Sequence, residues 1–337
     1  MPPSKGFLEN YSGIRVRATE LSFSVSDLAA SRPIQPPLVL GDVKVVSTNV
    51  LNYFLTLTTQ DATARGADSA LEFERQAAKI SLALGMMDAD VYGLVEVQNS
   101  AESAADLAAK VTIRNAERSY VAVGSKESRI GQDAIRCDYI YDHKKLALLG
   151  YKMLDDADPD IVDIVSGDGN GVIFGKPGTP GMNRVPLAAT FQRISGGENF
   201  TLIINHFKSK GSSCGNGDDS TEGAGNCNLK RTAAAKALLR WIDRNDFFTS
   251  TSNIILLGDL NAYAQETPVQ ELLAKGFTSP INLNSAYSYQ FSGESGTLDY
   301  ALVSGTAQYA ADYWHVNADE PNLLGTLPVE NLCTCRA

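Results

Sequence analysis

Residues 254–262, Ile-Ile-Leu-Leu-Gly-Asp-Leu-Asn-Ala, combine an apolar run with polar residues that follow it. The four apolar residues predict a buried strand, and Asp259 and Asn261 follow it in a loop at the strand's carboxyl end. Residues 202–206, Leu-Ile-Ile-Asn-His, repeat this arrangement, with His206 after the apolar run. Polar side chains that end apolar strands in this way predict that they gather at one rim of a sheet.

Polar residues of a few chemical types end several apolar strands of the sequence. They are Asn49, Glu96, His206, Asp259, Asn261 and Asp299. A single such residue is usually a local cap, but carboxylate and amide oxygens together are the ligands that a hard divalent cation takes. A histidine adds a proton donor or acceptor near neutral pH. Because hydrolysis of a phosphate ester uses a metal with acid–base groups, we expect the six to lie within ~10 Å of a common centre.

The chain divides into three parts. Residues 1–40 are weakly patterned and end in a proline-rich stretch, so they are interpreted as a remnant of a preceding module and a linker. Residues 41–321 form the organised domain, and residues 322–337 form an atypical tail. Within the domain, apolar strands mix with helices expected at 69–84 and 230–240, and another helix is expected to begin at Thr267-Pro268. This order predicts an α+β fold in which a sheet sandwich is flanked by helices.

The composition is that of a globular protein with a core. Apolar residues make up 44% of the chain, and 29 Lys and Arg against 39 Asp and Glu give a net charge of −10. No apolar run approaches the ~20 residues that a membrane span needs, and no signal peptide is visible at the start. The acidic balance argues against a nucleic-acid packaging protein, but not against an enzyme that meets phosphates through a metal. A monomer is expected.

The five cysteines predict one disulfide. Cys214 and Cys227 bracket a polar, glycine-rich segment, and a loop pinned in this way predicts a disulfide and an oxidising compartment. The alternative is a zinc site that adds Cys333 and Cys335, although the spacing fits no common zinc pattern. Cys137 lies in an apolar run and is expected to be a buried, inert thiol.

Seven segments together resemble a known family. They are Ser-Thr-Asn-Val-Leu-Asn-Tyr-Phe (47–54), Val-Glu-Val-Gln-Asn (95–99), Asn-His-Phe-Lys-Ser-Lys-Gly-Ser-Ser-Cys (205–214), Gly-Asn-Cys-Asn-Leu-Lys-Arg-Thr (225–232), Gly-Asp-Leu-Asn-Ala-Tyr (258–263), Tyr-Ser-Tyr (287–289) and Leu-Asp-Tyr-Ala (298–301). They resemble the endonuclease/exonuclease/phosphatase superfamily, and more closely its bacterial extracellular nucleases of the ExeM/NucH type. The resemblance implies a DNase I-like fold, a four-layer α/β/β/α sandwich of two mixed β-sheets flanked by helices.

The resemblance also implies a role for each candidate residue. Glu96 is expected to be the main Mg²⁺ ligand, with Asn49 beside it and Mn²⁺ or Ca²⁺ as alternative cations. Asp259 and Asn261 are expected to orient the attacking water and the scissile phosphate, and His206 to act on the leaving oxygen. The remaining two expected catalytic residues are Asp133, which would hold the tautomer of His206 or simply cap a strand end, and Asp299, which would orient a second histidine.

The leading interpretation is a metal-dependent phosphodiesterase that hydrolyses nucleic acid, an extracellular DNA endonuclease with RNA as an alternative substrate. Lys208, Lys210 and Arg231 are the expected substrate contacts, and a solvated helix face is the alternative interpretation of such charges. A phosphatase or lipid phosphodiesterase would share the fold, which cannot separate these activities. The other alternative is a catalytically dead remnant or a DNA-binding module.

The resemblance breaks at the carboxyl end. Related proteins close with a Ser-Asp-His-Asp-Pro type motif on a final strand, and residues 322–337 do not match it. His315 is expected to precede that motif and not to replace it, and His143 is expected at a solvent-facing strand exit. The mismatch puts the last strand in doubt and predicts a truncated or frame-disrupted copy with impaired activity.

Overall fold

The computed structural model describes residues 35–167, 172–215, 217–219, 223–249, 251, 253–283, 285–291, 294–305 and 308–316. Most of the expected amino-terminal remnant and all of the expected tail at 322–337 lie outside the described residues. No helix in the described ranges is both long enough and apolar enough to cross a membrane.

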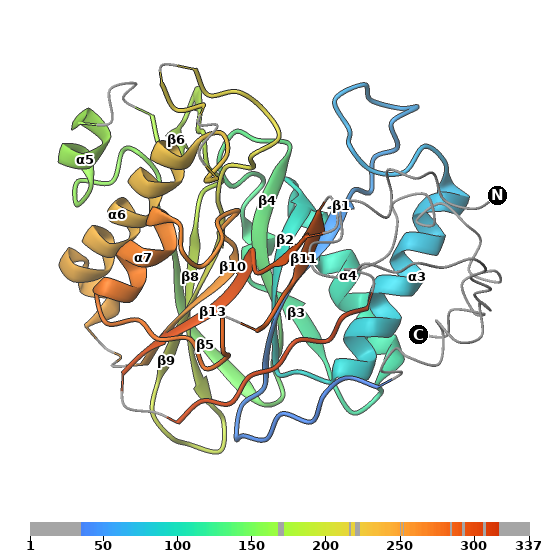
Figure 1. Cartoon of the computed structure of the whole chain (residues 1–337). Helices are drawn as coiled ribbons and strands as arrows, with labels where there is room; N and C mark the ends of the chain where they lie inside the picture. The colour runs from blue at the N-terminus through green and yellow to red at the C-terminus, as the bar shows by residue number, and fades with distance from the viewer. Residues whose placement is uncertain are drawn as a thin grey trace, which may run out of the picture.

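Two mixed β-sheets form the centre of the molecule (Figure 1). The first has the order β1-β2-β4-β3, with β1 (Val45–Tyr53), β2 (Val91–Gln98), β4 (Ile135–Asp142) and β3 (Tyr120–Ala122). The second has the order β13-β10-β9-β8-β5, with β13 (Asp299–Ser304), β10 (Asn253–Asp259), β9 (Phe200–His206), β8 (Leu187–Arg193) and β5 (Leu146–Met153). Two small hairpins pair β6 (Gly175–Lys176) with β7 (Thr179–Pro180) and β11 (Tyr289–Phe291) with β12 (Glu294–Gly296).

Helices cover both outer faces of the sandwich (Figure 1). The first sheet carries α3 (Ala70–Met87) and α4 (Ala101–Arg114), and the second lies beside α5 (Val162–Gly167), α6 (Asn228–Arg244) and α7 (Thr267–Ala274). Single 3₁₀ turns occur at η1 (Val123–Lys126) and η2 (Asp246–Phe248). The four-layer α/β/β/α architecture expected from the sequence is therefore confirmed. The elements that were not expected are α4, α5, β3, β5, β8 and the two small hairpins.

The alternation of side chains along β2 explains the layering. Val91 and Val95 belong to the core that joins the two sheets, whereas Tyr92 and Leu94 pack with α3 and α4 in a second core. Both faces of β2 are buried over its first five residues, so Val91 to Val95 are apolar or glycine and do not alternate with charged residues. On the opposite side, Trp241 of α6 is fully buried in the larger core.

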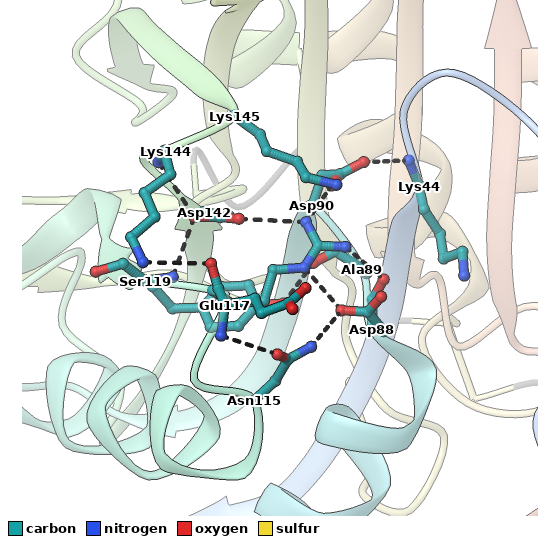
Figure 2. Close-up of polar contacts among 12 residues, drawn as sticks. Lys44, Asp88, Ala89, Asp90, Asn115, Glu117, Ser119, Asp142, Lys144 and Lys145 are labelled. Atoms are coloured by element: carbon teal, nitrogen blue, oxygen red, sulfur yellow. Dashed lines mark hydrogen bonds and ion pairs between the residues drawn. The ribbon is translucent and has the colours of Figure 1, made fainter.

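A network of charges closes the edge of the first sheet where β2 begins (Figure 2). The buried guanidinium of Arg118 contacts three carboxylates, at 2.7 Å from Asp88, 2.5 Å from Asp90 and 3.2 Å from Asp142. The backbone N–H of Lys44 also donates to Asp90 at 2.8 Å. One cation thus joins the end of α3, the start of β2 and the end of β4.

The expected disulfide is present and closes a loop beside the second sheet. Cys214 and Cys227 are bonded with a Cα–Cα separation of 5.3 Å. Asp218 within this loop accepts hydrogen bonds from the backbone N–H groups of Leu229 and Lys230, in the first turn of α6. The loop thereby caps the helix, because its carboxylate satisfies two N–H groups that have no partner inside the helix. Cys137 is a buried free thiol, as expected.

Replacing Arg118 should test the charge network. We expect Arg118→Met to lower the free energy of unfolding by about 3–5 kcal/mol, because it leaves buried carboxylates without their cation. Urea denaturation followed by circular dichroism measures this. Arg240→Met, which removes the exposed ion pair with Asp163, is the control and should cost less than about 1 kcal/mol. Equal losses in the two variants would show that the network contributes no more than a surface pair.

Removing the disulfide should lower stability through the unfolded chain. We expect Cys214→Ala with Cys227→Ala to lose about 3 kcal/mol, since a crosslink between residues 13 apart restricts a loop of this length when the protein unfolds. The thermal midpoint with and without reductant checks this. In the double variant, reductant should have no effect, and a persistent effect would point to another disulfide.

Candidate active site

Three neighbouring strands of the second sheet bring polar groups into one row. Asp259, the last residue of β10, pairs with His206 at the end of parallel strand β9. On its other side Asp259 pairs with Asp299, the first residue of antiparallel strand β13. Register alone therefore places a histidine and two carboxylates side by side at one edge of this sheet.

The turn after β10 is fixed by close packing. Gly258 has a φ of 113°, and a Cβ at this position would lie 2.1 Å from the carbonyl oxygen of Asn205. Asn261, with a left-handed φ of 47°, donates a backbone N–H to Asp259 Oδ1 at 2.8 Å and its side-chain amide to the Phe207 carbonyl at 3.1 Å. Residues 258–261 thus hold the Asp259 carboxylate next to the end of β9.

The first sheet contributes through two irregularities. Glu96 has a left-handed φ of 66°, and the pairing of β2 with β4 shifts its register between Leu94 and Val97. β1 shifts its register after Asn49. Such bulges turn side chains out of the regular alternation and are common beside active sites. Here they allow the side-chain amide of Asn49 to donate to Glu96 Oε1 at 3.0 Å, while the backbone N–H of Asn52 donates to Oε2 at 3.1 Å.

His206 joins the two halves of the site. Its Nε2 lies 3.9 Å from Glu96 Oε1 and 3.9 Å from Asp259 Oδ2. Five of the six strand-end residues are thus linked by direct contacts, and Asp299 is their neighbour through strand pairing. All six line one cavity of about 1940 Å³.

Burial controls the charge of His206. Burial and the nearby positive charge of Arg184 lower the pKa of His206 well below its usual value, so the imidazole is neutral near pH 7. Its buried Nδ1 has no hydrogen-bond partner among the described residues. A neutral ring whose Nε2 faces two carboxylates is best placed with its proton on Nε2, as a hydrogen-bond donor.

Burial shifts the pKa of the carboxyl groups in the opposite direction, upward. Burial, then the charges of Asp299 and Glu96, raise the pKa of Asp259 well above its usual value. Burial and the charge of Glu96 raise the pKa of Asp299 to about 6. These carboxyl groups lack enough nearby positive charge to stay ionised easily, and a cation placed among them would supply it. The oxygens of Glu96, Asp259, Asp299 and the two asparagines suit a hard divalent cation. Among the described residues, however, no three His, Cys, Asp or Glu side chains are already close enough together to hold a metal ion.

Asp133 is placed differently from its expected role. Its carboxylate pairs with Arg65 at 3.1 Å and with Arg184 at 3.2 Å, and it does not contact His206. The expectation that Asp133 holds the tautomer of His206 is therefore corrected. Arg65 and Arg184 line the same cavity and were missed at the sequence level. Both are single basic residues in loops, so no periodicity or motif marks them.

The three expected substrate contacts also differ from one another. Lys208 is partly buried, and its Nζ donates to Ser212 Oγ at 2.7 Å. Lys210 lines the cavity, but its ammonium is paired with Glu266 and lies 4.8 Å from the centre of the Tyr263 ring.

The expectation that Arg231 contacts the substrate is corrected. Its side chain is 0% exposed and donates to the carbonyls of Lys208, Asn226 and Ala224. It shapes the disulfide loop and is not placed to contact a substrate.

The other two histidines have separate partners. His143 is exposed and bonds to Ser119 Oγ at 2.9 Å, near the Arg118 network. His315 stacks on the ring of Tyr287 with centroids 3.9 Å apart, and its Nε2 lies 2.8 Å from the Tyr287 carbonyl oxygen. Of the three, His206 is the histidine that contacts the strand-end carboxylates.

One family model and several solved structures are similar to this chain. A model of the Endonuclease/Exonuclease/phosphatase family matches residues 46–321, whereas no curated protein sequence gives a significant match. Among solved structures, an endonuclease/exonuclease/phosphatase from Bacteroides vulgatus is similar at 12% identity and a TM-score of 0.48, over 79% of this chain and 88% of that one. The human Nocturnin catalytic domain with bound sulfate is similar at 16% identity and 0.46, over 78% and 82%. The mannosyl-6-phosphatase of Bacteroides thetaiotaomicron is similar at 14% identity and 0.46, over 78% and 85%. Since the family model spans most of the sequence, the chain belongs to the endonuclease/exonuclease/phosphatase family.

Proposed function

We propose that the protein is a metal-dependent phosphodiesterase that hydrolyses nucleic acid, acting as a DNA endonuclease outside the cell. Family membership supports hydrolysis of phosphodiester or phosphate bonds. The observation that carries the proposal is the contact of a buried, neutral histidine with carboxylates from both sheets. A neutral Nε2–H beside oxygen ligands can serve the leaving oxygen of a phosphate ester.

Each residue has a chemical task in this proposal. Glu96, Asn49 and Asp299 would hold Mg²⁺, or Mn²⁺ or Ca²⁺ in its place, and the cation would offset the charge that develops on the phosphate. Asp259 would accept a hydrogen bond from the attacking water, and the Asn261 amide would orient the phosphate. His206 would donate its Nε2 hydrogen bond to the leaving oxygen without itself carrying a full charge.

Two features support an extracellular location and a polyanionic substrate. The disulfide between Cys214 and Cys227 is of the kind that persists in oxidising environments, such as outside the cell. Arg65 and Arg184 place cationic side chains in the cavity of an acidic protein, where a polyanion would otherwise be repelled. The impaired activity expected from the mismatch at residues 322–337 stays a prediction, because these residues lie outside the described ones.

Hydrolysis of two substrates tests the proposal. The purified chain with Mg²⁺ should nick plasmid DNA and hydrolyse bis(4-nitrophenyl) phosphate, at the low rates that the mismatch at the carboxyl end predicts, and chelator should abolish both activities. We expect Glu96→Gln to reduce kcat/KM by at least about 10²-fold through loss of the main cation ligand. His206→Gln should lower it by about 10²–10⁴-fold, with most of the loss in kcat.

His143→Gln is the matched histidine control and should keep wild-type rates, since His143 lies in the exposed turn near the Arg118 network. Hydrolysis of 4-nitrophenyl phosphate but not of either diester would contradict the phosphodiesterase assignment and favour a phosphatase. Binding of plasmid without any hydrolysis would favour a DNA-binding module.

The pKa of Asp299 predicts how stability depends on pH without metal. Its folded pKa of about 6 lies above the unfolded value, so between about pH 4 and 6 the folded protein keeps a proton that the unfolded chain releases. Stability should therefore fall as pH rises through this window. Asp299→Asn should reduce the effect, because it removes this carboxyl group and its charge beside Asp259, and at pH 7 in chelator it should be up to about 3 kcal/mol more stable than the wild type. Mg²⁺ should stabilise the wild type far more than the variant. Parallel stability curves in urea from pH 4 to 7 would contradict the assignment.

A further inference from the structure

Two arginines share one carboxylate at the rim of the site. Arg65 lies in the loop between β1 and α3, Arg184 lies just before β8, and Asp133 lies just before β4. Arg65 Nη1 is 3.1 Å from Asp133 Oδ1, and Arg184 Nε is 3.2 Å from Asp133 Oδ2. We call these three residues the arginine clamp. Three segments distant in the sequence are thus held together by charge.

The backbone that carries the Asp133 carboxylate is held by hydrogen bonds of its own. The side-chain amide of Asn99, which directly follows β2, donates to the Asp133 carbonyl at 2.8 Å and to the Ile130 carbonyl at 2.9 Å. Arg129 Nη2 also donates to the Asp133 carbonyl, at 3.0 Å. The position of Asp133 therefore does not depend on its arginine partners.

The clamp is joined directly to the catalytic row. The backbone N–H of Arg184 donates to the carbonyl of His206 at 3.1 Å, and its Nη1 donates to the Phe207 carbonyl at 3.3 Å. The positive charge of Arg184 also contributes to the lowered pKa of His206. Arg65 and Arg184 line the same cavity as Glu96 and His206. An anion held by the clamp would thus lie beside His206.

The clamp carries more positive charge than its own carboxylate offsets. Lys208 lies close enough that burial and the positive charges of Arg184, Arg231 and Arg65 lower its pKa. Each guanidinium has five N–H donors, and the carboxylate occupies one nitrogen of each. The side chain of Arg65 is 46% exposed, against 13% for Arg184, so Arg65 is the member that can turn toward a ligand.

We propose that the arginine clamp is a second phosphate subsite, which binds the phosphate next to the scissile one. The inference rests on the proposed function and narrows it. A substrate that spans both positions must carry consecutive phosphates, so the geometry favours a nucleic-acid strand over an isolated diester or a phosphomonoester. Guanidinium groups suit this task because their donors match phosphate oxygens in pairs.

The test uses substrates with one phosphate and with many. Wild type and Arg65→Gln are compared on bis(4-nitrophenyl) phosphate and on a labelled single-stranded oligodeoxynucleotide about twelve nucleotides long. We expect Arg65→Gln to lower kcat/KM for the oligonucleotide about tenfold. Its kcat/KM for the single diester should stay within about twofold of wild type. Arg240→Gln, far from the site on α6, is the matched control and should change neither value.

Binding provides a readout that does not depend on activity. Oligonucleotide affinity is measured in chelator by fluorescence anisotropy at several salt concentrations. Arg65→Gln should weaken binding about tenfold and reduce the slope of log K against log salt by about 0.7, the value for one phosphate contact on a single strand. Arg65→Lys keeps the charge and should keep most of the wild-type slope. Thermal unfolding verifies that all variants are folded.

The outcomes separate the two proposals. The subsite is overturned if Arg65→Gln lowers kcat/KM equally on both substrates, if it leaves oligonucleotide affinity and salt slope unchanged, or if the wild type binds no oligonucleotide. If the wild type hydrolyses neither substrate but Arg65→Gln still weakens binding, the subsite stands and the proposed phosphodiesterase activity fails.

Discussion

The pairing register of β9, β10 and β13 is the constraint on which the candidate site depends. It places His206, Asp259 and Asp299 in adjacent positions of three strands, so their spacing is fixed by backbone hydrogen bonds and not by flexible side chains. A slip of one residue in any of these pairings would turn a polar group into the core and an apolar group into the cavity. The buried side chains of β9 and β10 hold this register because both of their faces are covered, by the first sheet on one side and by α6 on the other.

The first sheet meets this row by departing from regular structure. Its two bulges bring Asn49 and Glu96 toward the second sheet, and the Glu96 carboxylate is then fixed by donors from β1. The opposite end of β2 has no such irregularity, and there Arg118 joins three carboxylates in a closed network. One strand therefore carries a stabilising cluster where it begins and a cluster of unneutralised carboxylates where it ends. Because the two clusters lie at opposite ends of β2, the carboxylates of the candidate site can destabilise one end while the Arg118 network stabilises the other.

Much of the fold and of the candidate site could be predicted from the sequence, because the signals that indicate them are local or recur in several strands. Apolar runs that end in polar residues predict both the strands and the edge where their ends meet, and the polar loop between Cys214 and Cys227 predicts their disulfide. The order of strands and helices predicted a sheet sandwich flanked by helices, and the resemblance added its four-layer arrangement.

Other features depend on packing between distant segments, and a single sequence does not display it. Arg231 has the pattern of an exposed helical charge, yet the disulfide loop folds over it. Asp133 has the pattern of a partner for His206, but two arginines from separate loops reach it instead. The bulges at Asn49 and Glu96 likewise leave no mark in hydrophobic periodicity.

The left-handed backbone at the site determines which substitutions there would stabilise the protein. Four of the six non-glycine residues with positive φ among the described residues, Leu51, Asn52, Glu96 and Asn261, lie at or beside the site. Such a conformation costs roughly 1–2 kcal/mol for most residues and almost nothing for glycine. Glycine at position 96 would therefore relieve backbone strain and remove a carboxylate that lies 3.9 Å from His206. A search for heat-resistant variants that scores folding alone would select substitutions at these positions. The selected proteins would be more stable but would lack groups that the candidate site needs for catalysis.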